Sequence, residues 1–477
     1  MHAGDLVFIL PHILIAAGAV VLMLVIAFYR NYTLSFSLAL ASLAGALGAL
    51  IPRWGLPGKE LPLVTVDGYG VFFSMLLIVS TIAVTLMSHR YLRNRPGMRE
   101  EYFLLLLLAC LGTLVLVCSS HMASLFLGLE VLGVSLYTLI SYQRVSDPGL
   151  EAGIKYLILA GAASAFLLFG IALLYYDTGS MWFADLTAGM GRPGGVTTAG
   201  LAGSGLLLAG IGFKLGVVPF HMWTPDVFEG APAPVTAFIA TVSKGSMFAL
   251  LVRFFAPVEI AGRLLAVFTL IAIASMLAGN LLALYQDNVK RILAYSSIAH
   301  MGYALVAFLS AGSLRITAVT LYLLCYFISA MGAFGVVIAR SGPDREADHI
   351  QDYKGLFARS PWLTLVFSLF LISLAGLPLT AGFIGKFFVM RAGVGSNRWL
   401  LIISLIAGSA IGLFYYLKLL IVMYIPAGPA APSGPLKYDL WQTVVLAVLA
   451  GSLVWLGLNP SGLIRAVAAV AMGMGGG

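Results

Sequence analysis

The chain is organised as a series of long, almost uninterrupted apolar stretches separated by short polar segments. A helix needs about 20 mostly apolar residues to cross the hydrocarbon core of a bilayer, and about fourteen stretches approach or exceed that length. Their approximate cores are 6–29, 34–51, 68–89, 102–118, 123–142, 155–176, 201–218, 233–255, 264–285, 292–310, 316–339, 361–390, 399–424 and 440–458. The pattern therefore predicts an all-α integral membrane protein with about fourteen transmembrane helices.

The composition agrees with this prediction. Hydrophobic residues make up 61% of the 477-residue chain and charged residues only 10%, whereas about a quarter of a soluble domain is charged. The formal net charge of +8 is compatible with nucleic-acid binding, but the basic residues lie in short loops without interleaved aromatic side chains. We therefore expect no nucleic-acid partner, and we attribute the excess to membrane orientation.

The orientation can be predicted from the loops, because Lys and Arg accumulate on the inner side of a membrane protein. With the amino terminus outside, the Arg90–Arg99 cluster, Lys290 and Arg291 fall on the inner side, whereas Arg253 and Arg315 fall on the outer side. The inner loops then hold more basic residues than the outer ones. The sequence therefore predicts that both termini lie on the outer side.

Five ionisable residues lie inside the predicted spans, namely Glu130, Lys214, Lys244, His300 and Lys386. A charged side chain in the middle of a bilayer costs about 2.5–3.5 kcal/mol on insertion scales, so such residues are expected to face one another or water. Burial and a nearby carboxylate act in opposite directions on the proton affinity of a lysine. The five residues therefore predict a lateral proton relay. A Glu130–Lys214 pair that only joins two helices is the structural alternative.

Two further groups of polar residues accompany the relay candidates. Ser296 lies about one turn before His300 and Tyr303 lies three residues after it, so the three share roughly one helix face. Such a polar stripe is suited to holding ordered water. Glu151 and Lys155 are four residues apart, which is typical of an ordinary helix ion pair, but they are also candidates for tuning the charge of a neighbouring lysine.

Other polar and sulfur-containing residues in the spans have simpler interpretations. Lys418 lies near the inner end of its span, and we expect its ammonium to reach the membrane surface. Cys110, Cys118 and Cys325 form no CxxC or Cys/His cluster. We expect them to be small buried apolar residues, and we expect no metal site.

The seventh and twelfth spans are interrupted by glycine and proline, including Pro219 and Pro378. Irregular backbone at membrane depth is tolerated only where it is buried in protein or lines a cavity, and a pair of interrupted spans points to a transporter ion site. The two breaks are five spans apart, and each has a lysine nearby. Because five is an odd number, two five-helix repeats have opposite orientations. The expected segments are a three-helix segment at 1–100, repeats at 101–256 and 257–425, and a carboxyl-terminal helix and tail at 426–477.

Three long segments carry a family resemblance. The segments GFKLGVVPFHMWTPDVFEGAPAPVTAFIATVSK, NLLALYQDNVKRILAYSSIAHMGY and DYKGLFARSPWLTLVFSLFLISLAGLPLTAGFIGKF resemble the antiporter-like membrane subunits of respiratory complex I, the proton-translocating NADH:quinone oxidoreductase. Within that family, PFHMWTPDVFEGAP, GLEVLGVSLYTLISYQR with EAGIKY, and ARSPWL are most similar to the bacterial N-type subunits. The resemblance covers residues 100–424 approximately.

The resemblance implies a fold, a function and individual residue roles. It implies two inverted five-helix repeats with discontinuous helices seven and twelve, in the bacterial plasma (inner) membrane. It also implies that Glu130 and Lys214 form a charge pair whose separation gates the site, that Lys244 is the central relay lysine, that His300 is the connecting histidine, and that Lys386 is the terminal lysine. The outer side of the membrane is then the periplasm.

The resemblance also implies what surrounds the chain. The sequence holds no binding motif for NAD, FMN, iron–sulfur clusters or quinone. We expect these cofactors to bind to partner subunits. The expected partners are the other membrane and peripheral subunits of complex I, lipid, water and protons. Two alternatives remain open: a subunit of a multisubunit Na⁺ (cation)/proton antiporter, and a structural membrane subunit that does not pump.

Overall fold

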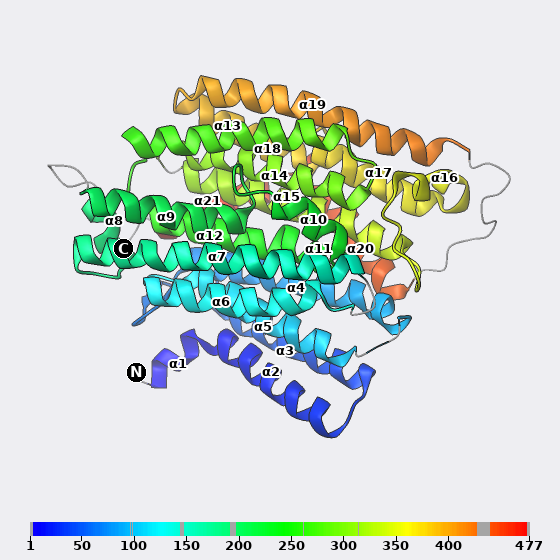
Figure 1. Ribbon diagram of the computed structural model, residues 1–477, viewed down its shortest axis with the longest axis horizontal. Coiled ribbons are helices and arrows are strands. Elements are labelled where there is room, and N and C mark those ends of the chain that lie inside the picture. Colours follow the sequence, from blue (N-terminus) through cyan, green and yellow to red (C-terminus); the bar gives the residue numbers. More distant parts are fainter. Residues whose placement is uncertain are drawn as a thin grey trace.

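The structure is a computed structural model that describes residues 3–95, 97, 99–143, 147–190, 197–260, 262–312, 314–426 and 439–474. Long helices run side by side through the molecule, with α2 and α3 at one edge and α19 at the other (Figure 1). The only strands in the described residues are β1 and β2, which are two residues long each and pair in antiparallel orientation. The all-α prediction therefore holds for the membrane-spanning part.

The amino-terminal segment and the region that continues through the first helix break to α12 contain sixteen elements. The first group is α1 (Ala3–Phe8), α2 (Leu10–Phe28), α3 (Tyr32–Leu50), η1 (Ile51–Arg53), β1 (Lys59–Glu60), β2 (Thr65–Val66) and α4 (Gly68–Arg93). The second group is α5 (Glu100–Cys118), α6 (Met122–Ile140), α7 (Asp147–Thr178), α8 (Phe183–Met190), α9 (Thr198–Leu215), α10 (Trp223–Gly230), α11 (Ala233–Phe238), the π-helix η2 (Ile239–Ser243) and α12 (Lys244–Phe255).

The rest of the described chain repeats this pattern of long helices and one interrupted span. Its elements are α13 (Gly262–Leu284), α14 (Val289–Phe308), α15 (Leu314–Arg340), η3 (Ile350–Tyr353), α16 (Leu356–Arg359), α17 (Pro361–Ala375), α18 (Ala381–Gly395), α19 (Trp399–Tyr424), α20 (Leu440–Leu458) and α21 (Ser461–Met474). The short helices α8, α16 and α21 lie outside the predicted apolar cores.

Polar residues cap the helices where the apolar stretches begin. Asn31, Asp67, Thr197 and Asn288 accept hydrogen bonds from the free amides of α3, α4, α9 and α14, at distances of 2.7–3.1 Å. Ser360 precedes α17, which starts at Pro361. These caps satisfy amides that have no partner within the helix, so the polar segments fix where each helix starts.

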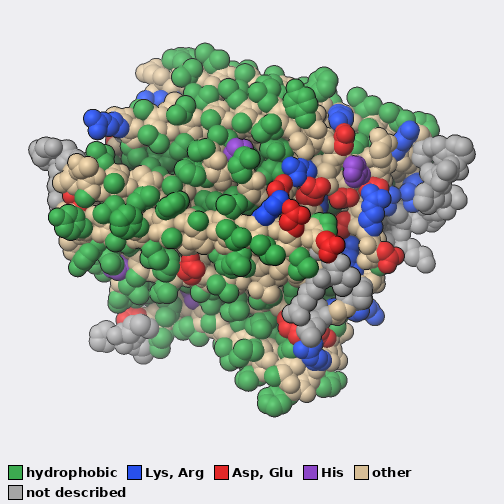
Figure 2. Space-filling model, in the orientation of Figure 1, with side chains coloured by type: hydrophobic (Ala, Val, Ile, Leu, Met, Phe, Trp, Pro, Cys, Tyr) green, Lys and Arg blue, Asp and Glu red, His purple; other side chains and the backbone are tan. Residues whose placement is uncertain are grey.

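Twelve helices among the described residues are long and apolar enough to cross a membrane. The two remaining predicted spans correspond to α14, which carries several polar residues, and to the interrupted pair α17 and α18. The segment Ala233–Phe255 is buried throughout, whereas only 28% of the window in Leu10–Phe28 is buried. The centre of the molecule therefore lies around α12, α14 and α15. Hydrophobic side chains are spread over much of the face shown in Figure 2.

Two arginines that we assigned to the outer ends of spans lie within helices. Arg253 lies in the last turn of α12, and Arg315 lies in the first turn of α15, with both residues buried. Arg253 forms an ion pair with Asp67, and Arg315 donates to the carbonyls of Phe255 and Val258 at 3.0–3.2 Å. The sequence pattern does not indicate the distant partners that allow these two arginines to be buried.

Candidate functional site at the two helix breaks

The first break separates α9 from α10 and begins at Gly216. Its φ of +66° is a left-handed conformation that glycine adopts without strain. The amides of Gly216 and Val217 bond back to carbonyls in the last turn of α9, at 2.9 and 3.1 Å, which forms a Schellman motif. The hydroxyl of Ser275 on α13 accepts the amide of Val218 at 3.0 Å. The broken backbone is therefore satisfied inside the protein.

The second break, between α17 and α18, has the same construction. Gly376 has a φ of +84°. The amides of Gly376 and Leu377 bond to the last turn of α17 at 2.9 and 3.2 Å, and the hydroxyl of Ser373 accepts the amide of Gly382 at 3.0 Å. The same Schellman motif therefore ends the first half-helix of both interrupted spans.

Lys244 lies at the first break and is fully buried. The π-helix η2 directly precedes it, and such bulges occur frequently at functional sites. A Cβ atom at Gly216 would lie 3.1 Å from the Lys244 Nζ atom. That Nζ atom donates to the Ser297 hydroxyl at 2.7 Å and lies 5.8 and 5.3 Å from the ring centroids of Trp223 and Phe228. The ammonium is therefore held by one hydroxyl and two aromatic faces.

Lys386 occupies the equivalent place at the second break, although it belongs to α18 itself. A Cβ atom at Gly376 would lie 2.6 Å from its Cδ atom and 3.1 Å from its Nζ atom. The Nζ atom donates to the Ala375 carbonyl at 2.8 Å and lies 5.0 Å from the ring centroid of Tyr303. The carboxyl end of a helix favours a cation, so the half-helix α17 stabilises this ammonium.

Glu130 and Lys214 approach each other but do not form an ion pair. The Glu130 carboxylate accepts the Ser164 hydroxyl at 2.7 Å. The buried Lys214 Nζ atom has no hydrogen-bond partner among the described residues. It lies 5.4 Å from the ring centroid of Tyr156, and a Cβ atom at Gly133 would lie 3.6 Å from it. Gly133 is one helical turn after Glu130, so the ammonium faces the same side of α6 as the carboxylate.

Aromatic side chains lie between Lys214 and Lys244. The ring centroid of Trp223 is 5.0 Å from that of Tyr156 and 5.5 Å from that of Phe213. The indole of Trp223 donates to the Phe213 carbonyl at 2.8 Å, which holds it across the break. Because Lys214 contacts Tyr156 and Lys244 contacts Trp223, these rings separate the two ammonium groups.

His300 connects α14 to α15 and α19. Its Nδ1 atom lies 2.7 Å from the Tyr322 hydroxyl, and its Nε2 atom lies 3.5 Å from the Tyr416 hydroxyl. The Tyr416 hydroxyl also forms a hydrogen bond with Ser296. Ser297, the partner of Lys244, precedes His300 by three residues on the same helix, so one face of α14 joins Lys244 to the histidine.

Tyr303 links Lys386 to a second set of polar groups. Its ring faces the Lys386 ammonium, and its hydroxyl accepts a 2.8 Å hydrogen bond from the Asn280 side chain. The carbonyl oxygen of Asn280 accepts the Tyr415 hydroxyl at 3.1 Å. The predicted polar stripe of Ser296, His300 and Tyr303 is therefore present, and it extends onto α13 and α19.

A small cavity lies between His300 and Lys386. The space available to water centres is about 10 Å³, which is close to the room one water molecule requires. The cavity lining contains imidazole, phenol, hydroxyl and ammonium groups, all of which can hydrogen-bond to water. The lining residues are His300, Tyr322, Cys325, Tyr326, Ser329, Ser373, Leu374, Gly382 and Lys386.

The supporting residues lie around the breaks or at the end of the bundle. Pro219 and Pro378 are exposed and lie in the turns of the first and second break. Glu151 and Lys155 form the expected helix ion pair at 2.6 Å, and Lys155 also pairs with Asp226 on α10 at 2.9 Å. The Glu151–Lys155 pair is therefore connected to the second half of a broken span.

Lys418 has a partner that its position in the sequence did not indicate. Its Nζ atom pairs with the Asp287 carboxylate at 2.9 Å. The side chain is partly exposed, as expected for a lysine near the end of a span. It therefore joins α19 to the loop between α13 and α14.

Two buried ion pairs were missed by the sequence interpretation. Lys290, which we expected in a loop, pairs with Glu346, and Arg253 pairs with Asp67. A charged residue close to the end of a span was the only available signal, because the partners are 56 and 186 residues apart. Among the described residues, no group of three or more His, Cys, Asp or Glu side chains is placed to hold a metal ion.

Comparisons with known proteins match this arrangement. The family model of the NADH:quinone oxidoreductase/Mrp antiporter transmembrane domain matches residues 119–412, which include both breaks and all five relay candidates. The chain belongs to this family, among the antiporter-like N-type membrane subunits of complex I. It is 47% identical to NADH-quinone oxidoreductase subunit N of Methylococcus capsulatus, over 98% of this chain and 96% of that protein. The corresponding protein of Ectopseudomonas mendocina is 43% identical over the same shares.

Solved structures show the same fold. A chain in respiratory complex I from Thermus thermophilus aligns with a TM-score of 0.83 and 32% identity, covering 96% of this chain and 99% of that one. A chain of the Mrp complex from Dietzia aligns with a TM-score of 0.87 at 20% identity, covering 98% and 97%, and this likeness concerns the fold alone. The predicted complex I membrane subunit is therefore confirmed, and the identities give the cation antiporter alternative no comparable support.

Proposed function

We propose that this chain translocates protons in NADH:quinone oxidoreductase through the buried groups at its two helix breaks. The observation that carries this proposal is the position of Lys244 and Lys386. Each ammonium lies against the left-handed glycine that ends a half-helix, with a Cβ position 3.1 Å from Nζ in both cases. Ionisable residues within a membrane mark ion pathways, and helix breaks hold the ion sites of transporters.

Glu130 and Lys214 form the gate in this proposal. Their charged groups are separate, and the Lys214 ammonium has no hydrogen-bond partner among the described residues. A small movement of α6 against α9 that closes the gap would hold a proton on Lys214, and opening the gap would favour its release. Motion transmitted from neighbouring subunits thereby changes the proton affinity of the first lysine.

From Lys214 the proton passes the break to Lys244. The Thr224 hydroxyl is buried and has no hydrogen-bond partner among the described residues, and it lies 2.5 Å from the Cβ position of Gly216. The Lys244 Nζ atom lies 3.1 Å from the same Cβ position, so in this proposal Thr224 passes the proton on to Lys244. Lys214 becomes a neutral amine when it releases the proton, and Lys244 becomes an ammonium when it receives it.

The second part of the route leads to Lys386. The Lys244 ammonium donates to Ser297, and His300 lies on the next turn of α14. His300 and Lys386 line the same small cavity, so a single water molecule bridges them in this proposal. Lys386 is then the last buried group before the exit.

We infer the finer architecture from the breaks and the chain ends. Fourteen transmembrane segments result when α14 and the α17–α18 pair are added to the twelve long apolar helices. The matched Schellman motifs support inverted repeats at 101–256 and 257–425. Both chain ends lie at one end of the bundle, and most charged side chains on the visible face gather at the other (Figures 1 and 2). This arrangement supports termini on the outer, periplasmic side.

The redox chemistry belongs to other subunits in this proposal. NAD, FMN, iron–sulfur clusters and quinone bind there, and electron transfer from NADH to quinone releases the energy. This chain contributes the membrane path, and it is driven by contacts with neighbouring membrane subunits. Its own residues hold and move protons at Glu130, Lys214, Lys244, His300 and Lys386.

The test uses the assembled complex in sealed membrane vesicles. We expect Lys214→Ala and Lys244→Ala each to lower the number of protons pumped per NADH oxidised, measured with a pH-sensitive dye alongside NADH absorbance. Lys59→Ala, which removes a partly exposed lysine, is the control and is expected to pump like the wild type. Wild-type pumping in both relay variants would contradict the proposal.

A structural role for the lysines gives a different result. It predicts a smaller amount of assembled complex, but the same number of protons per NADH in the complex that does assemble. A native gel stained for NADH oxidation measures the first quantity, and the vesicle assay measures the second. The two measurements together separate a relay from helix-joining charges.

A further inference from the structure

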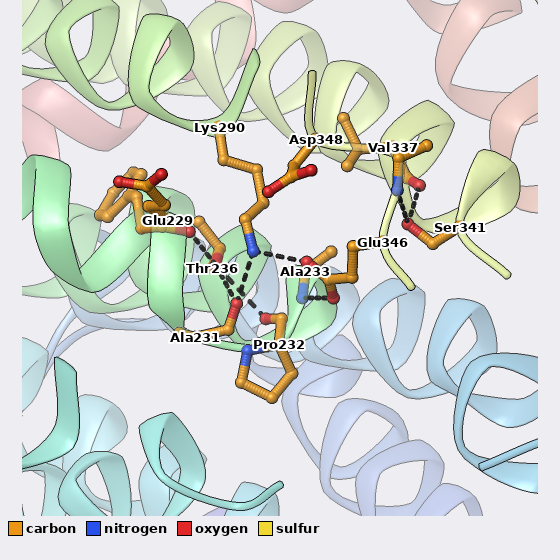
Figure 3. Close-up of polar contacts among 12 residues, drawn as sticks. Glu229, Ala231, Pro232, Ala233, Thr236, Lys290, Val337, Ser341, Glu346 and Asp348 are labelled. Atoms are coloured by element: carbon orange, nitrogen blue, oxygen red, sulfur yellow. Dashed lines mark hydrogen bonds and ion pairs between the residues drawn. The ribbon is translucent and has the colours of Figure 1, made fainter. Parts of the chain in front are cut away.

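Lys290 holds the end of the half-helix α10. This residue lies in the first turn of α14 and is buried. Its Nζ atom donates to the Ala231 carbonyl at 2.9 Å and forms an ion pair with Glu346 (Figure 3). Ala231 is the residue that directly follows α10. Lys290 therefore fixes α10 at the point where the chain turns into α11.

Glu346, the ion-pair partner of Lys290, holds the beginning of the next helix, α11. It belongs to the loop after α15, and its carboxylate accepts the Ala233 amide at 2.9 Å (Figure 3). The same carboxylate accepts the hydroxyl of Tyr91 on α4. An anion at the amino end of a helix satisfies a free amide and interacts favourably with the helix dipole, so Glu346 fixes α11 in position.

Arg291 holds α10 along its length. Its guanidinium pairs with Asp226 at 2.9 Å and with Glu229 at 2.7 Å. Both acids belong to α10, and both are partly exposed, so these two pairs lie nearer the surface than the Lys290–Glu346 pair. Two consecutive residues of α14 therefore hold α10 in place. Lys290 does so from inside the protein, at the end of the helix, and Arg291 does so nearer the surface.

These contacts connect directly to the relay. The helix α14 that carries Lys290 and Arg291 also carries Ser297 and His300. The helix α10 carries Trp223, which faces the Lys244 ammonium. The segment that starts at Ala233 runs through η2 into Lys244. A shift of α10 or α11 against α14 would therefore change the distance between Lys244 and Ser297.

We propose that Lys290, Arg291 and Glu346 form a clamp on α10 that positions the Lys244 ammonium against Ser297. The three are positioning residues, because the contacts shown for them are to α4, α10, α11 and the neighbouring loops rather than to the relay groups. A buried ion pair adds little net stability but costs much when one partner is removed, which suits a device that specifies one arrangement. This inference rests on the proposed proton relay.

The test compares two neighbouring residues of the same loop. Glu346→Gln removes the clamp charge, whereas Arg345→Gln removes an exposed charge whose ion pairs among the described residues are with Asp348 in the same loop and Asp352 in η3. Protons per NADH are measured in vesicles that contain the whole complex, with Lys244→Ala in parallel. We expect Glu346→Gln to reproduce at least half of the loss seen in Lys244→Ala, and Arg345→Gln to match the wild type. Glu346→Asp retains the charge and should restore most of the pumping.

The outcomes separate the clamp from the relay. If Lys244→Ala lowers the proton ratio and Glu346→Gln does not, the clamp is refuted and the relay stands. If Lys244→Ala pumps like the wild type, the relay itself fails. Should Glu346→Gln reduce assembly, Glu229→Gln gives the decision, because it removes one of the two partly exposed pairs of Arg291 and leaves the Lys155–Asp226 pair intact. A wild-type proton ratio in that variant overturns the clamp.

Discussion

The Lys244 ammonium donates a 2.7 Å hydrogen bond to the Ser297 hydroxyl, from α12 to α14. No other hydrogen bond of this ammonium is formed among the described residues, and its remaining close neighbours are the rings of Trp223 and Phe228. Hydrogen bonds to charged groups contribute about 1.5–3 kcal/mol. Among the described residues, the Lys244 ammonium therefore has a single hydrogen-bond partner, and the two aromatic rings are its other favourable contacts.

Replacing that hydroxyl should impair pumping without unfolding the protein. We expect Ser297→Ala to lower the protons pumped per NADH, because the Lys244 ammonium loses its partner at a cost of about 1.5–3 kcal/mol. Ser297→Thr retains a hydroxyl and should pump better than Ser297→Ala. Ser246→Ala is the control, since Ser246 is equally buried near Lys244 but bonds to the Ser243 carbonyl. Equal pumping by Ser297→Ala and the wild type would contradict this prediction.

The Schellman glycine of the first break should not tolerate a side chain. Gly216→Ala places a Cβ atom 2.5 Å from the Thr224 hydroxyl and forces an L-residue into the left-handed region, which alone costs about 1–2 kcal/mol. We expect less assembled complex and faster thermal inactivation. Gly205→Ala on the same helix is the control, because its Cβ meets open space and alanine favours helix by about 1 kcal/mol. Equal stability of the two variants would refute the requirement for glycine.

The sequence reveals the spans and the breaks because both are local features. An apolar stretch of sufficient length identifies each helix, and a glycine, which adopts the left-handed conformation without strain, marks where α9 and α17 end. Lys214, Lys244 and Lys386 stand out because charge inside an apolar stretch is costly. The positions of these residues could therefore be predicted, together with the expectation that they approach one another or water.

The ion pairs that hold the helices could not be predicted in the same way. Lys290 and Arg253 lie near the ends of spans, where basic residues are common, and nothing in their surroundings indicates burial. Their partners Glu346 and Asp67 come from distant segments. The separation of Glu130 and Lys214 also depends on the packing of α6 against α9, which a sequence pattern does not contain.

Asp67 and Arg253 should anchor the amino-terminal helices. The Arg253 guanidinium forms two hydrogen bonds with the Asp67 carboxylate, at 2.6 and 3.0 Å, and both side chains are largely buried. Removing one partner of a buried pair costs about 3–5 kcal/mol. We therefore expect Asp67→Asn to reduce the amount of assembled complex strongly on a native gel.

A surface pair provides the control for Asp67→Asn. Asp287→Asn breaks the exposed pair with Lys418 at 2.9 Å, and exposed pairs contribute about 0–1 kcal/mol. We expect its assembly to remain close to that of the wild type. If both variants assembled equally well, the buried pair would not be an anchor.

Glu346 should make the stability of the protein depend on pH in acid. Burial alone would raise the pKa of its carboxyl, but the Lys290 ammonium and hydrogen bonds from Lys290, Tyr91 and the Ala233 amide hold that pKa below its ordinary value of 4.5. A carboxyl with a lowered pKa contributes stability that is fully present above its unfolded value and is lost as pH falls through the folded value. We therefore expect unfolding in detergent to become easier below about pH 4.5.

Thermal unfolding between pH 7 and pH 3 measures this pH dependence. Glu346→Gln should be less stable than the wild type at pH 7 and lose less stability on acidification. Arg345→Gln is the control and should lose as much stability on acidification as the wild type. If Glu346→Gln also lost as much, the Glu346 carboxyl would not contribute to the acid sensitivity.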